Sequence, residues 1–101
     1  MTRREELDEI FRDVDEDEKK LVNHLINEVI FLEEQMTLLK KLPFIRVHPN
    51  NPALQKATPA AKQYKEYSQS YMNATRILLN VLRKVESSAQ DELLKRLEEF
   101  S

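Results

Sequence analysis

All four prolines of this chain, which contains no glycine, lie between positions 43 and 59. Proline lacks the amide hydrogen that a helix needs, and it disfavours the helical conformation of the residue before it. A helix therefore cannot run through this segment, and the prolines predict an extended, turning connector. On either side the composition is typical of long helices, with 34% charged residues and neither Cys nor Trp.

Apolar residues recur with helical spacing on both sides of the connector. They predict two long helices at about 16–42 and 59–87, and short helices within 1–14 and 88–101. Because two long helices with a connector of this length fold back most simply on each other, we predict a single all-α domain. Residues 15–87 form its core, a long antiparallel helical hairpin, and the terminal helices are accessories.

Three sites in the sequence have the pattern of a helix start. Thr2 and Glu5 have the spacing of a capping box, and Asp15 is placed to cap the second helix. Thr58 followed by Pro59 is typical of an N-cap and a first helical residue.

Both long helices carry an apolar seam with the spacing of a coiled coil. The seam residues that we expect in the core or between subunits are Val22, Leu25, Val29, Leu32, Met36, Leu39, Tyr64, Tyr71, Leu78 and Leu82. Further apolar residues, including Phe31 and Leu38, lie beside the seam, so the apolar surface is wider than one partner helix covers. This excess predicts a homo-oligomer.

Charge is strongly segregated, although the net charge is only -2. Residues 1–34 carry twelve acids and five bases, whereas residues 35–85 carry nine bases and the single acid Glu66. A basic middle between acidic ends suits either a polyanion or the acidic ends of a neighbouring copy.

Basic residues near the connector are the candidate DNA-binding residues, because Lys and Arg grip phosphates without reading bases. They are Lys40, Lys41, Arg46, Lys56, Lys62 and Lys65. The alternative is that they are solvated or make contacts between subunits. Lys40 and Lys41 also suit the negative end of the second helix dipole, an explanation that does not extend to Lys62 and Lys65.

The sequence predicts no catalytic residues, no cofactor and no metal. Phosphate-binding loops need glycine, thiol chemistry needs cysteine, and neither His24 nor His48 has the spacing of a helical metal site. The adjacent acids Glu33 and Glu34 are interpreted as solvated. No apolar run approaches the length of a membrane span, so we expect an intracellular, non-enzymatic protein without a membrane partner.

Several segments together resemble the small terminase subunits of tailed double-stranded DNA phages. They are Asp17-Glu18-Lys19-Lys20, Leu38-Leu39-Lys40-Lys41, the run from Leu42 through His48-Pro49 to Pro52, and Thr58-Pro59-Ala60-Ala61-Lys62-Gln63-Tyr64. The resemblance covers about residues 15–86. It implies a DNA-packaging component in the cytoplasm of the bacterial host, which forms a homo-oligomer that can be a ring. Its implied partners are double-stranded viral DNA and the large terminase subunit, which holds the ATPase and nuclease.

The chain departs from the family pattern at its N-terminus, where many members have a helix-turn-helix. The start is acidic and has no recognition helix, so the basic middle is the candidate DNA surface. In the final helix, the amphipathic set Leu93, Leu94, Leu97 and Phe100 is the candidate docking surface for the large subunit. The competing interpretation is an α-helical adaptor or assembly protein that does not bind DNA.

Overall fold

The computed structural model describes residues 2–43, 45–48, 51–85 and 87–100. Over these residues the chain is mainly helical, which confirms the predicted all-α class. The elements are α1 (Arg3–Ile10), α2 (Glu16–Leu39), β1 (Ile45–His48), β2 (Asn51–Ala57), α3 (Pro59–Leu82) and α4 (Ser87–Phe100). None of the helices in the described ranges is long and apolar enough to cross a membrane.

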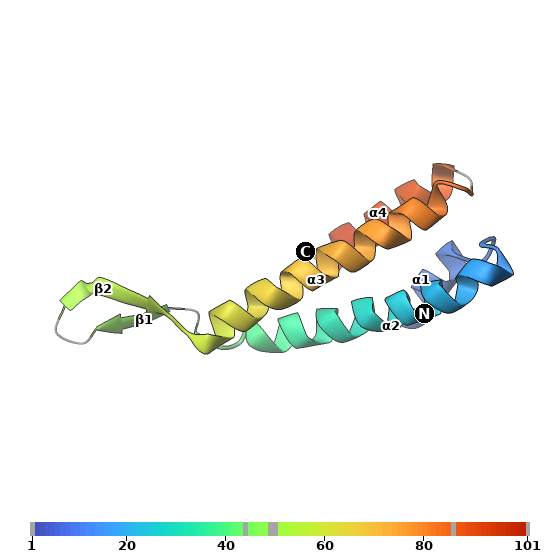
Figure 1. The fold of residues 1–101 in the computed structure, drawn as a ribbon. Helices are drawn as coiled ribbons and strands as arrows, with labels where there is room; N and C mark the ends of the chain where they lie inside the picture. The colour runs from blue at the N-terminus through green and yellow to red at the C-terminus, as the bar shows by residue number, and fades with distance from the viewer. Residues whose placement is uncertain (1, 44, 49–50, 86, 101) are drawn as a thin grey trace.

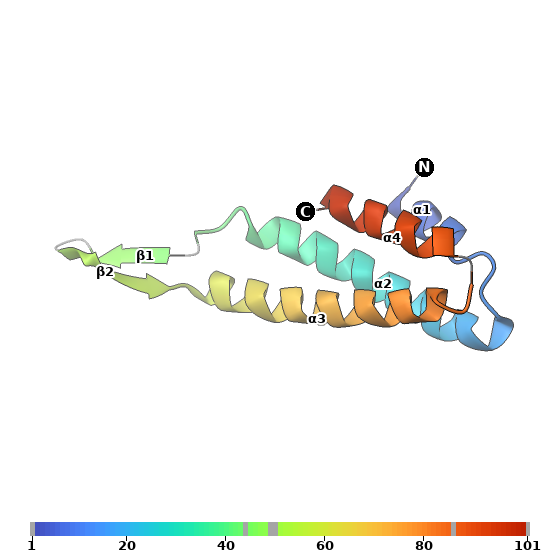
Figure 2. The same cartoon turned by 90° about the horizontal axis from the view of Figure 1, so that it is seen from above.

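Helices α2 and α3 lie side by side and are joined at one end by the two strands (Figure 1). Seen from above, α1 and α4 lie together on one side of this pair (Figure 2). The molecule is 59 Å long and only 24 Å and 20 Å across, because the ribbon extends beyond the ends of α2 and α3 (Figure 1).

The helix starts follow from local hydrogen bonding. Thr2 Oγ1 accepts from the Glu5 amide at 3.2 Å, and the Glu5 carboxylate accepts from the Thr2 amide at 3.3 Å, so the predicted capping box is confirmed. Thr58 Oγ1 likewise accepts from the Ala61 amide at 3.3 Å. Asp15 occupies the N-cap position of α2, but its side chain makes no capping hydrogen bond.

Both long helices end before the predicted positions 42 and 87. The Leu42 amide donates to the Leu39 carbonyl and the Val85 amide to the Leu82 carbonyl, each at 3.0 Å. These bonds to the third preceding residue tighten the chain into turns that no longer continue an α-helix. After α2 the cause is Pro43, which disfavours helix at Leu42.

Between the long helices, β1 and β2 pair as an antiparallel ribbon, which was not predicted. The register sets Ile45 opposite Ala57 and Arg46 opposite Lys56, and it shifts between Val47 and His48. Each strand has only one neighbour, so a proline in β2 does not interrupt a second ladder.

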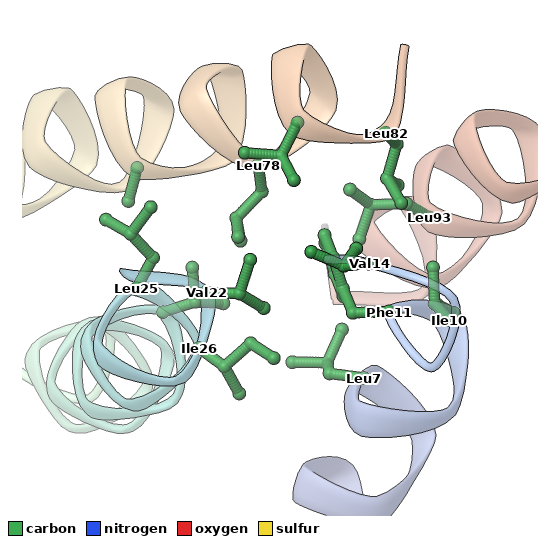
Figure 3. Close-up of a cluster of buried hydrophobic side chains, with 13 residues drawn as sticks. Leu7, Ile10, Phe11, Val14, Val22, Leu25, Ile26, Leu78, Leu82 and Leu93 are labelled. Atoms are coloured by element: carbon green, nitrogen blue, oxygen red, sulfur yellow. The ribbon is translucent and has the colours of Figure 1, made fainter. Parts of the chain in front are cut away.

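The main core lies where all four helices meet (Figure 3). The ribbon lies at the opposite end of the molecule from this core (Figure 1). Leu7 of α1, Ile26 of α2, Leu82 of α3 and Leu93 of α4 are fully buried in the core. Burying one such side chain contributes roughly 1.5–3 kcal/mol. The ribbon and the adjoining ends of α2 and α3 therefore extend beyond this core.

Candidate nucleic-acid interface

Five of the six candidate lysine and arginine residues have described side chains, and all five are exposed. Lys40 and Lys41 follow the last residue of α2, Lys56 lies in β2, and Lys62 and Lys65 lie in the first two turns of α3. The chain thus gathers these five lysines at the junction of the helices with the ribbon. Arg46 lies in β1, and its side chain lies outside the described part of the structure.

These lysines have no carboxylate partner among the described residues. By contrast, Arg3, Arg4 and Arg12 in the acidic N-terminal region each form ion pairs with nearby carboxylates. Exposed ammonium groups that no described carboxylate neutralises remain able to bind an external anion.

Lys40 is the candidate that makes a described interaction within the chain. Its Nζ lies 6.0 Å from the Tyr64 ring centroid and 5.5 Å from the Phe100 ring centroid. Both distances are within the range of a cation–π attraction. Lys40 is therefore tied to α3 and α4, whereas Lys56 and Lys62 line an open hollow of about 410 Å³ beside the ribbon.

The predicted seam residues are either buried or partly exposed. Seven of them are buried, namely Val22, Leu25, Val29, Leu32, Met36, Leu78 and Leu82. The other three are partly exposed, namely Leu39, Tyr64 and Tyr71. Beside the seam, Leu21, Phe31 and Leu38 are each about half exposed, at 48%, 48% and 54%.

Most of the candidate docking residues of α4 pack against other helices of the same chain. Leu93 is fully buried in the core, Leu97 packs against that core, and the Phe100 ring lies 5.5 Å from the Tyr71 ring. Leu94 is 45% exposed. In this structure the Leu93 side chain packs within its own chain, in the core shared with α1 and α3, and is not exposed to a partner.

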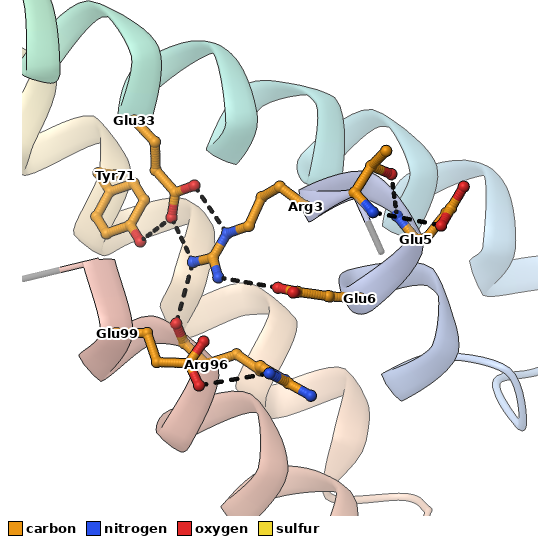
Figure 4. Close-up of polar contacts among 8 residues, drawn as sticks. Arg3, Glu5, Glu6, Glu33, Tyr71, Arg96 and Glu99 are labelled. Atoms are coloured by element: carbon orange, nitrogen blue, oxygen red, sulfur yellow. Dashed lines mark hydrogen bonds and ion pairs between the residues drawn. The ribbon is translucent and has the colours of Figure 1, made fainter.

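A polar network joining all four helices was missed at the sequence level (Figure 4). Glu33, interpreted as solvated, is only 7% exposed. It accepts from Arg3 Nε at 3.0 Å, from Arg3 Nη2 at 2.7 Å and from the Tyr71 hydroxyl at 2.7 Å. Arg3 also donates to the Arg96 carbonyl at 3.1 Å. One feature of the sequence could have predicted the burial of Glu33. It follows the core residue Ile26 by seven residues, so both side chains lie on the flank of α2 that faces α1.

The environment of this network raises the pKa values of two ionisable groups, Tyr71 and Arg3. Burial and the hydrogen bond to Glu33 raise the pKa of Tyr71 well above its ordinary value. The hydrogen bond to Glu33 raises the pKa of Arg3, outweighing the opposite effect of burial. Both shifts favour the protonated donors that Glu33 requires, so the network is structural and holds α4 and α1 to the long helices.

The described residues contain no group of three or more His, Asp or Glu side chains placed to hold a metal ion. No family model, curated protein or solved structure matches this chain.

Proposed function

We propose that this protein is a DNA-packaging component, the small terminase subunit of a tailed phage, acting in the cytoplasm of the bacterial host. Its hairpin of α2 and α3 oligomerises, its basic end binds double-stranded viral DNA, and it recruits or regulates the large subunit. Any ATPase and nuclease chemistry belongs to that large subunit. One observation supports DNA binding: five exposed lysines, which have no carboxylate partner in the described part of the chain, lie together where the long helices meet the ribbon.

A gel-shift titration with duplex DNA at several salt concentrations tests this function. Because each phosphate contact releases about 0.9 counterion, five lysines predict a log–log salt slope of about -4.5 per subunit. Reversing Lys40, Lys41, Lys62 and Lys65 to Glu should abolish the shift. The matched control reverses Lys19, Lys20, Arg83 and Lys95, which changes the net charge equally at described positions away from the ribbon. Unchanged DNA retention by the first variant would refute the basic end as the DNA surface.

The adaptor interpretation has its own support in the exposed apolar side chains of α2. Leu21, Phe31 and Leu38 recur at spacings that keep them on one flank of the helix, and each is about half exposed. A partner helix or another copy would cover them. If the purified protein has no affinity for DNA at low salt, this alternative is preferred.

Oligomerisation is tested separately by native mass measurement. We expect an assembly larger than a monomer at micromolar concentration, and dissociation when Phe31 and Leu38 are both changed to Glu. A wild-type monomer would contradict the proposed assembly.

A further inference from the structure

We propose that two copies of this chain pair through an uncovered flank of α2, with the two α2 helices antiparallel and related by a two-fold axis near the middle of the helix. This inference rests on the oligomerisation in the proposed function. It adds which face the copies share, which way they run relative to each other and which residues meet.

One side of the α2–α3 pair is bare. In Figure 1, α1 and α4 lie behind the two long helices, and Figure 2 shows both of them on one side of α2. Glu33 lies on that covered side, where it binds Arg3 of α1. Phe31 comes two residues before Glu33, so it lies about 160° away around the helix. Among the described elements only the edge of α3 reaches this side of α2, and Phe31 is 48% exposed.

A second seam with coiled-coil spacing runs along the uncovered flank. Its residues follow one another at alternating steps of three and four positions, and they are Leu21, His24, Glu28, Phe31, Gln35 and Leu38. The buried residues of α2, among them Leu25 and Leu32, form a different row. Phe31 is held in place by Tyr67 of α3, whose ring centroid lies 6.4 Å away in an edge contact. The flank is therefore a long, ordered row that suits another helix.

The order of residues along this second seam favours an antiparallel copy of the same helix. Two copies set antiparallel about an axis through the middle of the seam bring Leu21 of each beside Leu38 of the other. His24 then lies beside Gln35, so apolar residues meet apolar residues and polar residues meet polar ones. A parallel pair in register instead sets Glu28 beside Glu28, where the two carboxylates repel each other.

Charge favours the same orientation. Five exposed lysines lie where the long helices meet the ribbon. The opposite end of the molecule holds α1 and the start of α2, which belong to a stretch, residues 1–34, with twelve acids and five bases. Antiparallel copies bring the lysine group of each towards the acidic end of the other, whereas parallel copies would bring the two lysine groups together. The pair then presents one group of lysines at each of its ends.

Cysteine cross-linking tests the orientation, because the chain contains no cysteine of its own. The full-length variants are Leu21→Cys, Leu38→Cys and the double variant with both changes. A disulfide needs Cα atoms within about 7 Å, and these two positions are about 25 Å apart along one helix, so they cannot bond within a chain. We expect mild oxidation to convert the double variant, but neither single variant, to a covalent dimer. A covalent dimer from either single variant, or none from the double variant, would overturn the antiparallel pairing.

The shared face is tested with Phe31→Glu. Met72→Glu is the matched control, because Met72 is 65% exposed and lies about 140° around α3 from Tyr67, the residue that contacts Phe31. A two-fold interface contains each substitution twice, so Phe31→Glu should raise the dissociation constant of the pair about 100-fold or more, while the control leaves it unchanged. Sedimentation measures both constants, and circular dichroism checks that both variants are folded. Equal dissociation constants for the two variants would refute the shared face.

This pairing and the proposed function fail in different ways. If native mass measurement finds the wild-type protein monomeric, the proposed oligomerisation fails and the pairing fails with it. If wild type assembles but the single cysteine variants cross-link, or Phe31→Glu leaves the assembly intact, only the antiparallel pairing through α2 is refuted.

Discussion

Tyr71 of α3 donates a 2.7 Å hydrogen bond to the same Glu33 carboxylate that Arg3 of α1 binds with two nitrogens. Since Arg3 also donates to the backbone of α4, one buried acid organises contacts among all four helices. Glu33 thereby couples the terminal helices to the pair that carries the candidate DNA surface.

Replacing Glu33 with Ala should destabilise the protein by about 2–3 kcal/mol, because the Arg3 and Tyr71 donors lose their acceptor. The adjacent Glu34 is exposed, so Glu34→Ala should change the free energy of unfolding by less than about 0.5 kcal/mol. Urea denaturation of both variants gives the comparison. Equal effects would show that Glu33 is not the organising acid.

The raised pKa of Tyr71 predicts a dependence of stability on pH. Its hydroxyl stays protonated in the folded state at pH values where it ionises in the unfolded chain. The contribution is therefore fully present below the ordinary pKa of 10.0 and is lost as the pH rises above it. The difference in unfolding free energy between wild type and Tyr71→Phe should shrink between pH 9 and pH 11, which chemical denaturation at each pH measures. A constant difference would contradict the shift.

Leu93 and Leu94 form a matched pair on α4. Leu93 is fully buried and Leu94 is 45% exposed. Leu93→Ala should cost about 2–5 kcal/mol through the lost contacts and the cavity left behind, while Leu94→Ala should cost less than about 0.5 kcal/mol. Thermal unfolding distinguishes them. Similar small effects would mean that α4 does not pack on its own chain in solution.

Thr58 both caps α3 and ties its start to the Pro43 carbonyl. Thr58→Ala should lower the free energy of unfolding by about 1–2 kcal/mol, whereas Thr58→Ser keeps the hydroxyl and should retain most of the stability. Hydrogen exchange of the α3 amides locates the effect, since faster exchange is expected in its first turn. Equal exchange in the two variants would exclude the hydroxyl as the stabilising group.

The short-range features of this fold could be predicted from sequence because their causes lie within a few residues. The capping box at Thr2 and the start of α3 at Thr58 are examples, and each depends on residues three positions apart. Helical class follows from apolar spacing, which is likewise local. The predicted end positions of α2 and α3 were less accurate, because the tightening of a final helical turn depends on the backbone that follows it.

The candidate lysines could be chosen from charge segregation alone, but their grouping at one end depends on how α2, the ribbon and α3 are arranged. The pairing of Arg46 with Lys56 is a further case, because strand register depends on contacts across a turn.

Residue types and their spacing along the chain were sufficient to predict where helix must stop, where each helix begins, and that the basic residues surround the connector. The arrangement of the helices in space was needed to show that Glu33 is buried while Glu34 is exposed, and that Leu93 packs within its own chain. The physical reason is distance along the chain. Glu33 meets partners at positions 3 and 71, and its burial is tolerated only because both donors arrive there together.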